Sequence, residues 1–163
     1  MSIFPKIGWR TIKTFIAVFL CCLASYFLNL PPLYAIIAAL MSMRPTQDES
    51  LRAGVERIAG TLVGSFFAML FVLVEFHFFP DDLLLRYTLL SLGVFPIILT
   101  TVAYKHPEIS SFSCIVYFVL VLSHQYGQSP VDAMMKRIMI TILGVIIALA
   151  VNALIAPQKP DAA

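Results

Sequence analysis

The sequence predicts an all-α integral membrane protein with six transmembrane helices, arranged as two inverted three-helix repeats over about residues 9–78 and 83–156. Composition is the first observation behind this prediction. Hydrophobic residues make up 60% of the chain and charged residues only 12%, whereas about a quarter of the residues of a soluble domain are charged. A chain with so few polar groups cannot cover its own surface against water, so we expect lipid to surround it.

The second observation is a series of six apolar runs. They cover about residues 14–30, 32–43, 58–79, 87–104, 109–123 and 138–156. Within them Glu75, near the end of the third run, is the one side chain among Asp, Glu, Lys and Arg. Backbone groups in hydrocarbon must be hydrogen-bonded within the protein, and these runs do not alternate as barrel strands do, so we expect helices.

The elements of the first half follow from its turn signals. A helix over about residues 9–29 ends before Pro31, and the next apolar segment, 33–43, has 11 residues. That segment is about 16 Å long as a helix, shorter than the roughly 30 Å of hydrocarbon, so it predicts a short or broken helix. Thr46 begins a capping-box sequence, and we expect a long helix to follow over about 47–77.

The second half repeats this order. A helix over about residues 83–104 contains Pro96, which should kink it, and Pro107 opens a short helix that ends near residue 123. A capped long helix over about 130–155 completes the half, with Pro130 at its first position. Each half is therefore a long helix, a Pro-initiated short helix and a capped long helix.

The third observation is a pattern that occurs twice, once in each of the two capped long helices. Its members are Arg57, Thr61, Gly64 and Ala68 in the first copy and Arg137, Thr141, Gly144 and Ala148 in the second. The spacing i, i+4, i+7 and i+11 puts each set on one face of a helix. The small residues, including Gly60, predict close helix packing.

The distribution of basic residues indicates the orientation. With the N-terminus in the cytoplasm, eight Lys and Arg residues fall on the inner side and three on the outer side, as the positive-inside rule requires. Both termini are then cytoplasmic, and the second repeat enters from the opposite side. Short segments at corresponding positions of inverted repeats point to a binding site near the bilayer midplane. We expect one transmembrane domain over residues 1–163, with no soluble domain.

The repeated Arg and Thr residues are the main candidates for a binding site. Arg57 and Arg137 lie near opposite membrane surfaces, where they either reach lipid headgroups or recognise an organic anion with the planar guanidinium. Thr61 and Thr141 either line a central path or bond back to their own helices.

Further candidates lie on the short helices and at one helix end. Ser42 and Ser113 could line the substrate path, and Tyr34 and Tyr117 could stack on an aromatic ring. Glu75 either reaches outer headgroups or carries protons for coupling. The apolar runs hold no ionisable residue near their centres. The sequence contains no enzyme motif, so we expect no catalytic residue, no cofactor, no metal and no nucleic-acid partner.

Several short motifs extend over most of the chain. They are Arg10-Thr11-Ile12-Lys13-Thr14, Ser42-Met43-Arg44-Pro45-Thr46, Ser50-Leu51, the segment from Arg57 to Gly64, and Gly144 to Leu149 with Asn152 and Pro157. Together they resemble the aromatic acid exporter (fusaric acid resistance) family, over about residues 10–157. The resemblance implies a bacterial inner-membrane protein that exports aromatic carboxylic acids with the proton gradient, in some members with a periplasmic adaptor. Larger members carry two such membrane modules and soluble domains, so for one module the resemblance implies a homo-oligomer, with a dimer favoured.

The sequence supports one main hypothesis and two alternatives. The main hypothesis is a secondary transporter that exports small aromatic or amphipathic organic acids across the inner membrane. A membrane scaffold or accessory subunit of an efflux assembly would need only the packing surfaces. A passive anion channel would need the basic residues but no coupling group.

Overall fold

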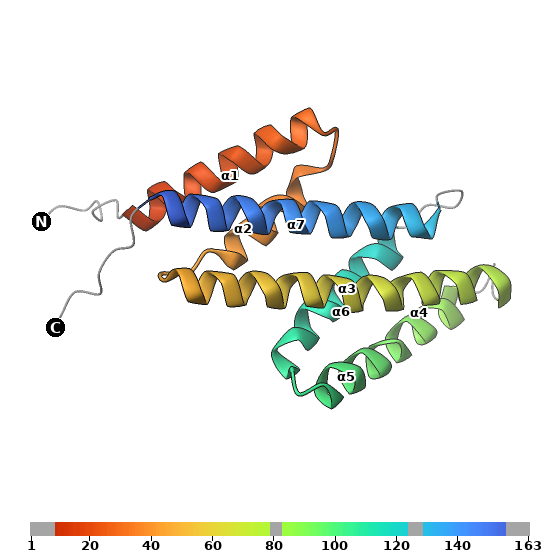
Figure 1. Cartoon of the computed structure of the whole chain (residues 1–163). Coiled ribbons are helices and arrows are strands. Elements are labelled where there is room, and N and C mark those ends of the chain that lie inside the picture. Colours follow the sequence, from red (N-terminus) through yellow and green to blue (C-terminus); the bar gives the residue numbers. More distant parts are fainter. Residues whose placement is uncertain (1–8, 79–82, 124–128, 156–163) are drawn as a thin grey trace, which may run out of the picture. The chain divides into compact units, whose positions relative to one another are not determined.

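The computed structural model describes residues 9–78, 83–123 and 129–155. Within these ranges it contains seven α-helices and no strand, which confirms the all-helical prediction (Figure 1). The helices are α1 (Trp9–Phe27), α2 (Pro32–Ser42), α3 (Gln47–Phe78), α4 (Leu83–Leu92), α5 (Val94–Ala103), α6 (Pro107–Ser123) and α7 (Pro130–Leu154).

In the part of the chain that the structure describes, three helical segments are long and apolar enough to cross a membrane. They are Gln47–Glu75, Leu84–Ala103 and Pro130–Leu154, and three shorter apolar helices accompany them: Thr11–Phe27, Pro32–Ser42 and Pro107–Ser123. The 32 residues of α3 correspond to about 48 Å of helix, more than the roughly 30 Å hydrocarbon layer. A membrane location is therefore well supported, whereas the number of six complete spans stays a prediction.

The helix starts agree with the turn signals. The Glu49 amide donates to the Thr46 side-chain oxygen at 3.3 Å, just where α3 begins. Proline stands at the first position of α2, α6 and α7, where its missing N–H has no helical partner to lose. The capping prediction for Thr46 and the short lengths of α2 and α6 are confirmed.

The predicted helix over residues 83–104 is interrupted, although not at Pro96 itself. The break is at Gly93, between α4 and α5, and Pro96 lies in the first turn of α5. A proline ring disturbs the turn that precedes it, because it removes one helical hydrogen bond and crowds the carbonyl four residues earlier. The break therefore lies in the turn before the proline.

Packing divides the chain into two compact units, which share the two long helices. Unit 1 comprises Met1–Val55 with Ile140–Ala163, and unit 2 comprises Glu56–Met139. Unit 1 thus contains α1, α2, the start of α3 and most of α7. Unit 2 contains the rest of α3, then α4, α5 and α6, and the start of α7.

The core of unit 1 is built from small side chains. Its buried residues are Ala17 and Cys21 of α1, Ala35, Ala39 and Met43 from α2 and its C-terminal end, and Ile140, Ala148 and Val151 of α7. Small side chains allow helices to approach closely without a large hydrophobic driving force, which is the usual packing mode in lipid. The Cys21 thiol donates to the carbonyl oxygen of Ala35 at 3.7 Å.

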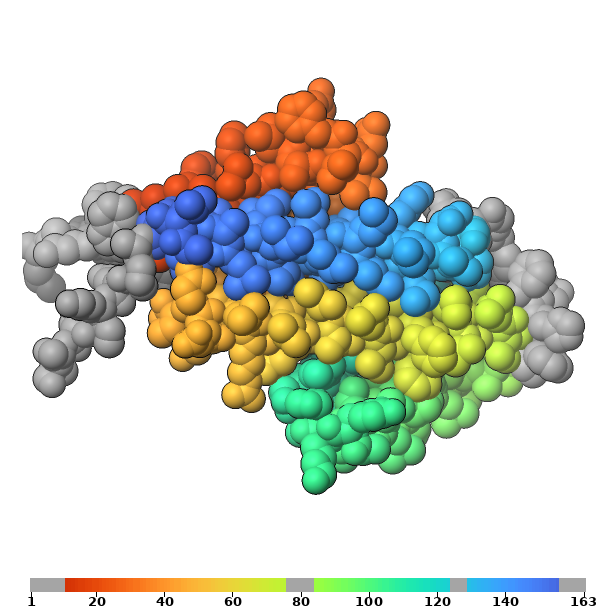
Figure 2. Space-filling model, in the orientation of Figure 1, coloured from red at the N-terminus to blue at the C-terminus, as the bar shows by residue number. Residues whose placement is uncertain are grey.

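The core of unit 2 contains larger side chains. It includes Ala68 and Val72 of α3, Leu90 of α4, Ile97 of α5, and Tyr117 and Val121 of α6. Bulky apolar residues such as Phe15 of α1 and Phe95 of α5 are instead mostly exposed. Parts of α1, in red to orange, and of α5, in green, are visible in the space-filling view (Figure 2). Such exposed apolar surface is expected of a protein in contact with lipid.

The connections into the two short helices have the same geometry. After α1, Asn29 has a positive φ of 54°, and the Leu30 amide donates to the carbonyl of Ser25 at 3.0 Å. After α5, Lys105 has a φ of 60°, and the His106 amide donates to the carbonyl of Thr101 at 3.0 Å. Both are Schellman endings, in which a left-handed residue satisfies the last helical carbonyls.

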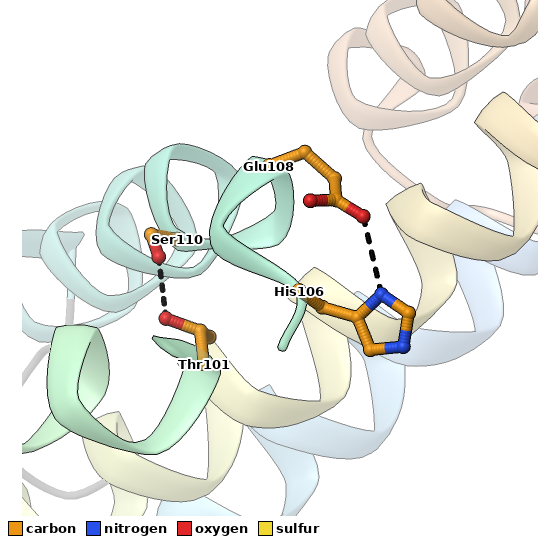
Figure 3. Close-up of polar contacts among 4 residues, drawn as sticks. All are labelled: Thr101, His106, Glu108 and Ser110. Carbon is orange, nitrogen blue, oxygen red and sulfur yellow. Dashed lines mark hydrogen bonds and ion pairs between the residues drawn. The ribbon is translucent and has the colours of Figure 1, made fainter. Parts of the chain in front are cut away.

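The second of these connections also carries side-chain contacts. The hydroxyls of Thr101 and Ser110 bond to each other, and His106 Nδ1 lies 3.1 Å from Glu108 Oε1 (Figure 3). The first contact joins α5 to α6 across the connection, and the second joins the connection to the first turn of α6. They fix the direction in which α6 leaves α5.

Candidate functional site

Arg57 lies in α3 and is buried, with 4% of its surface exposed. Its guanidinium carbon is 4.7 Å from the centre of the Phe112 ring of α6, within unit 2. This distance is within cation–π range. The burial argues against simple anchoring of Arg57 to lipid headgroups, which needs an exposed guanidinium. The arrangement combines a positive charge with an aromatic surface on facing helices.

The hydroxyls near Arg57 are occupied by their own helices. Thr61 donates to the carbonyl of Arg57 at 2.9 Å, and Ser113 donates to the carbonyl of Ile109 at 3.1 Å. Both residues are buried. The alternative in which Thr61 bonds back to its helix is therefore the one that the structure has. Such hydroxyls contribute to a binding surface only after they rotate.

The second copy of the motif is buried to a similar degree. Arg137 is 4% exposed and lies in unit 2, while Thr141 is 2% exposed and lies in unit 1. Ser42, at the end of α2 in unit 1, is fully buried. The motif therefore does not place a solvent-exposed Arg at either end of the module.

The two tyrosines occupy different environments. Tyr34 is half-buried and packs against the core cluster of unit 1. Tyr117 is 1% exposed, its hydroxyl donates to the carbonyl of Leu90 at 3.1 Å, and its ring packs edge-on against Phe71 and Phe118. Neither face of the Tyr117 ring is open in this arrangement, so its assignment as a stacking platform stays a prediction that requires rearrangement.

Glu75 is 8% exposed, near the end of α3. Its Oε1 lies 2.5 Å from Nε of Arg86 in α4, close enough for an ion pair, although the two groups are not aligned as a hydrogen bond. The contact joins the last turns of α3 to the first turn of α4 within unit 2. Glu75 is thus held by a cation of its own chain rather than directed outward to headgroups.

The glycines lie where helices cross most closely. A Cβ atom at Gly64 would overlap the carbonyl oxygen of Ser113 and lie 2.9 Å from Val116 Cβ. A Cβ atom at Gly144 would overlap the carbonyl oxygen of Ala35 and lie 2.9 Å from Ala38 Cβ. Gly60 is slightly less crowded, with Phe112 Cβ at 2.9 Å from such an atom. Ala68 and Ala148 are buried in the cores of units 2 and 1.

These crossings identify the corresponding residues of the two short helices. Gly64 meets Ser113 in α6 as Gly144 meets Ala35 in α2, so Ser113 and Ala35 occupy corresponding positions. The aromatic residue just before each crossing is then Tyr34 in α2 and Phe112 in α6. The counterpart of Tyr34 is therefore Phe112 rather than Tyr117, and this aromatic pair is a signal that a comparison of the two short helices could have found.

Asn152 has a structural role that the sequence did not indicate. Its Nδ2 donates to Ser50 Oγ at 2.9 Å and lies 3.3 Å from the Arg44 carbonyl and 3.4 Å from the Thr46 carbonyl. Its Oδ1 accepts from Nζ of Lys13, which is 7% exposed, at 3.3 Å. One side chain of α7 thus connects α1, the α2–α3 connection and α3 within unit 1. Asn152 belongs to the last apolar run, which favours a position near the membrane midplane. In the structure its side chain lies beside the connection between α2 and α3.

Comparison with known proteins identifies the family of the chain. The profile of aromatic acid exporter family member 1 matches residues 5–155, in agreement with the resemblance noted in the sequence. The chain is similar to a UPF0421 protein of Staphylococcus saprophyticus, with 32% identity over 94% of the chain and 44% of the relative. A UPF0421 protein of Bacillus thuringiensis is 30% identical over 93% of the chain and 40% of the relative. The chain thus spans less than half the length of these relatives. No solved structure matches it.

Proposed function

The chain belongs to the aromatic acid exporter family, and from this membership we propose that it is a secondary transporter of small aromatic or amphipathic organic acids. It would export them across the bacterial inner membrane with both termini in the cytoplasm. The proposed activity needs no covalent step and no cofactor. A homo-oligomer, with a dimer favoured, and an adaptor on the periplasmic side are the proposed partners.

The pairing of Arg57 with Phe112 is the observation that carries the proposal. A guanidinium offers a planar fork that fits a carboxylate, and the adjacent ring offers an apolar face for an aromatic substrate. The buried position of Arg57 strengthens its attraction for an anion, because charges interact more strongly away from water. An aromatic carboxylate matches both groups, whereas a purely apolar solute would leave the charge without a role.

Two repeated features support an inverted duplication as the basis of transport. The Schellman endings at Asn29 and Lys105 stand at the same place in each half, just before the short helices α2 and α6. The close crossings at Gly64 and Gly144 stand at the same place in the repeated motif, and each joins a long helix to a short Pro-initiated helix. Transporters built from inverted repeats commonly alternate access by moving one repeat against the other around a midplane site.

The ion pair between Glu75 and Arg86 is the proposed place of proton coupling. Protonation of Glu75 would remove the attraction to Arg86 and loosen the contact of α3 with α4. When Glu75 releases the proton, its ion pair with Arg86 would form again and restore the contact of α3 with α4. The coupling group then lies at a helix end, which is consistent with the absence of ionisable residues near the centres of the apolar runs.

Flux through proteoliposomes tests the proposal. Proteoliposomes that contain the purified protein in the inverted orientation should take up a labelled aromatic acid such as benzoate when a pH gradient is applied. Arg57→Gln should lower the rate at least tenfold, because the charge that attracts the carboxylate is lost. Arg52→Gln is the matched control, since Arg52 is an exposed residue of the same helix, and it should leave the rate within twofold.

The gradient dependence separates the alternatives. Uptake that persists at the same rate after the pH gradient is collapsed would identify a passive anion channel. Absence of flux for every acid of a panel, with the protein folded, would favour the scaffold or accessory role. Equal rates for Arg57→Gln and Arg52→Gln would remove Arg57 from the binding site.

A further inference from the structure

A small cavity lies within unit 2, between α3, α6 and the first turns of α7. Its walls include Ser65 and Ala68 of α3, Leu120 of α6, and Pro130 and Met134 of α7. The space open to the centre of a water molecule is about 10 Å³, which is close to the minimum for one water-sized group. Apart from the Ser65 hydroxyl, the side chains named here are apolar.

The Ser65 hydroxyl does not use the partner that its helix offers. A serine or threonine within a helix usually donates to the carbonyl four residues earlier. Thr61, Thr88, Ser91, Thr100, Thr101, Ser113 and Ser123 all do so. Ser65 is fully buried, and its Oγ has no hydrogen-bond partner among the described residues. Ser25 and Ser42 share this property, but neither lines the cavity. The Ser65 hydroxyl therefore borders the cavity with its hydrogen-bonding capacity unused.

A buried polar group without a partner destabilises the folded state, and the cavity adjacent to it is of the right size for one partner atom. We propose that the cavity is a binding site for a single hydroxyl group, which hydrogen-bonds to Ser65 Oγ. The hydroxyl belongs either to a bound water or to the phenolic end of an aromatic substrate. The second source rests on the proposed function, whereas the first does not.

The walls suit both sources. Met69 and Met134 contribute to the cavity, and methionine side chains adapt their shape more readily than branched ones. They can therefore move apart for a ring or close around one water. In the other long helix the corresponding position, directly after Gly144 as Ser65 is directly after Gly64, is Val145. The Val145 side chain lies 2.6 Å from a Cβ atom built at Gly54, so it fills the space between α7 and the start of α3.

The sign of a change in melting temperature tests the proposal. If the hydroxyl of Ser65 is bound, Ser65→Ala removes a hydrogen bond and should lower the melting temperature by about 2–4 °C. Ser113→Ala is the matched control, because Ser113 is equally buried but bonds to its own helix. The two variants share the same gain in helix propensity. A melting temperature of Ser65→Ala equal to or above that of the control would overturn the proposal.

Thiol labelling provides an independent measurement of whether the site at position 65 admits a small group. Ser65→Cys and Val145→Cys are made in protein in which Cys21, Cys22 and Cys114 are replaced by alanine. Methyl methanethiosulfonate is small and uncharged, so it can pass between the methionine walls, and we expect position 65 to react at least tenfold faster than position 145. Equal reaction rates would contradict the site.

Two aromatic acids, 4-hydroxybenzoate and benzoate, then distinguish a substrate hydroxyl from a bound water. A larger rise in the melting temperature of the natural protein with 4-hydroxybenzoate than with benzoate, absent in Ser65→Ala, assigns the hydroxyl to a substrate. No difference between the two acids assigns it to water. These outcomes do not depend on transport. If the natural protein shows no benzoate flux but Ser65→Ala melts at a lower temperature, the proposed function is rejected and the site is kept.

Discussion

The two units place different chemistry at corresponding positions of the long helices. In unit 1, Asn152 of α7 bonds to Ser50 of α3. When Arg57 is aligned with Arg137, the counterparts of these two residues are Val72 of α3 and Pro130 of α7, which instead line the cavity of unit 2. The contacts at these positions therefore differ between the two copies of the Arg-Thr-Gly-Ala motif. At these positions unit 1 has directional hydrogen bonds, whereas unit 2 has apolar contacts beside a cavity.

This difference has consequences for motion. Hydrogen bonds of a buried network hold a narrow range of distances and angles, and losing one member leaves the others unsatisfied. Apolar contacts beside a cavity tolerate small shifts, because no directional bond must break. We therefore expect unit 2 to rearrange more readily than unit 1. The transport proposal would place the first conformational change in the unit that contains Arg57 and Ser65.

The largest expected effect comes from giving unit 1 the chemistry of unit 2. Asn152→Val removes the hydrogen bonds to Ser50 and Lys13 and leaves a buried amine with one partner fewer. We expect a loss of about 3 kcal/mol in the free energy of unfolding. Thermal unfolding in detergent, followed by circular dichroism, measures it.

A more conservative variant serves as the control for this prediction. Asn152→Asp keeps the acceptor for Lys13 but loses the amide donor to Ser50, and it should fall between the natural protein and Asn152→Val. If Asn152→Val instead melts at the natural temperature, the network in unit 1 contributes no rigidity, and the contrast between the units disappears.

The crossings at Gly64 and Gly144 provide a test of what the units share. Alanine at either position would overlap a backbone carbonyl of the facing short helix. We expect each substitution to destabilise the protein by about 2 kcal/mol, after the gain of roughly 1 kcal/mol in helix propensity. The two effects should be similar in size, and they should add within about 0.5 kcal/mol in the double variant. Melting temperatures of the single and double variants measure them.

Gly60→Ala is the graded comparison, because its nearest neighbour is a side-chain atom rather than a carbonyl oxygen. It should cost less than Gly64→Ala. A large effect at Gly64 with none at Gly144 would show that the crossings are not equivalent, and it would weaken the case for an inverted duplication.

Much of the fold was predictable because its signals are local. Thr46 caps α3, and prolines open α2, α6 and α7, since these effects act within one helical turn. Pro96 predicts a kink, but the sequence does not show which residue of the preceding turn leaves the helix, and in the structure this residue is Gly93. Helix identity and order therefore followed from the chain itself, and boundaries mostly agreed within a few residues.

The site was less predictable because it depends on contacts between distant residues. The repeat drew attention to Arg57, but its partner Phe112 lies on a different helix and carries no motif. Asn152 and Lys13 are 139 residues apart. Their separate positions in apolar or basic segments gave no sign that they bond. Residue type alone places the hydroxyls of Thr61 and Ser113 on the path, but it does not determine the rotamers in which both bond to their own helices.

The smallest expected effect concerns Tyr117, which marks another divergence between the units. When Ser113 is aligned with Ala35, its counterpart in α2 is Ala39, a small residue of the unit 1 core. In unit 2 the Tyr117 hydroxyl bonds to the carbonyl of Leu90 and lies against Gly93, where α4 and α5 are interrupted. Tyr117→Phe should lower stability by about 1 kcal/mol, or the melting temperature by about 2–4 °C. Tyr87→Phe, at an exposed site of α4, should change nothing, and an equal fall for both variants would mean that the hydroxyl does not hold the α4–α5 break.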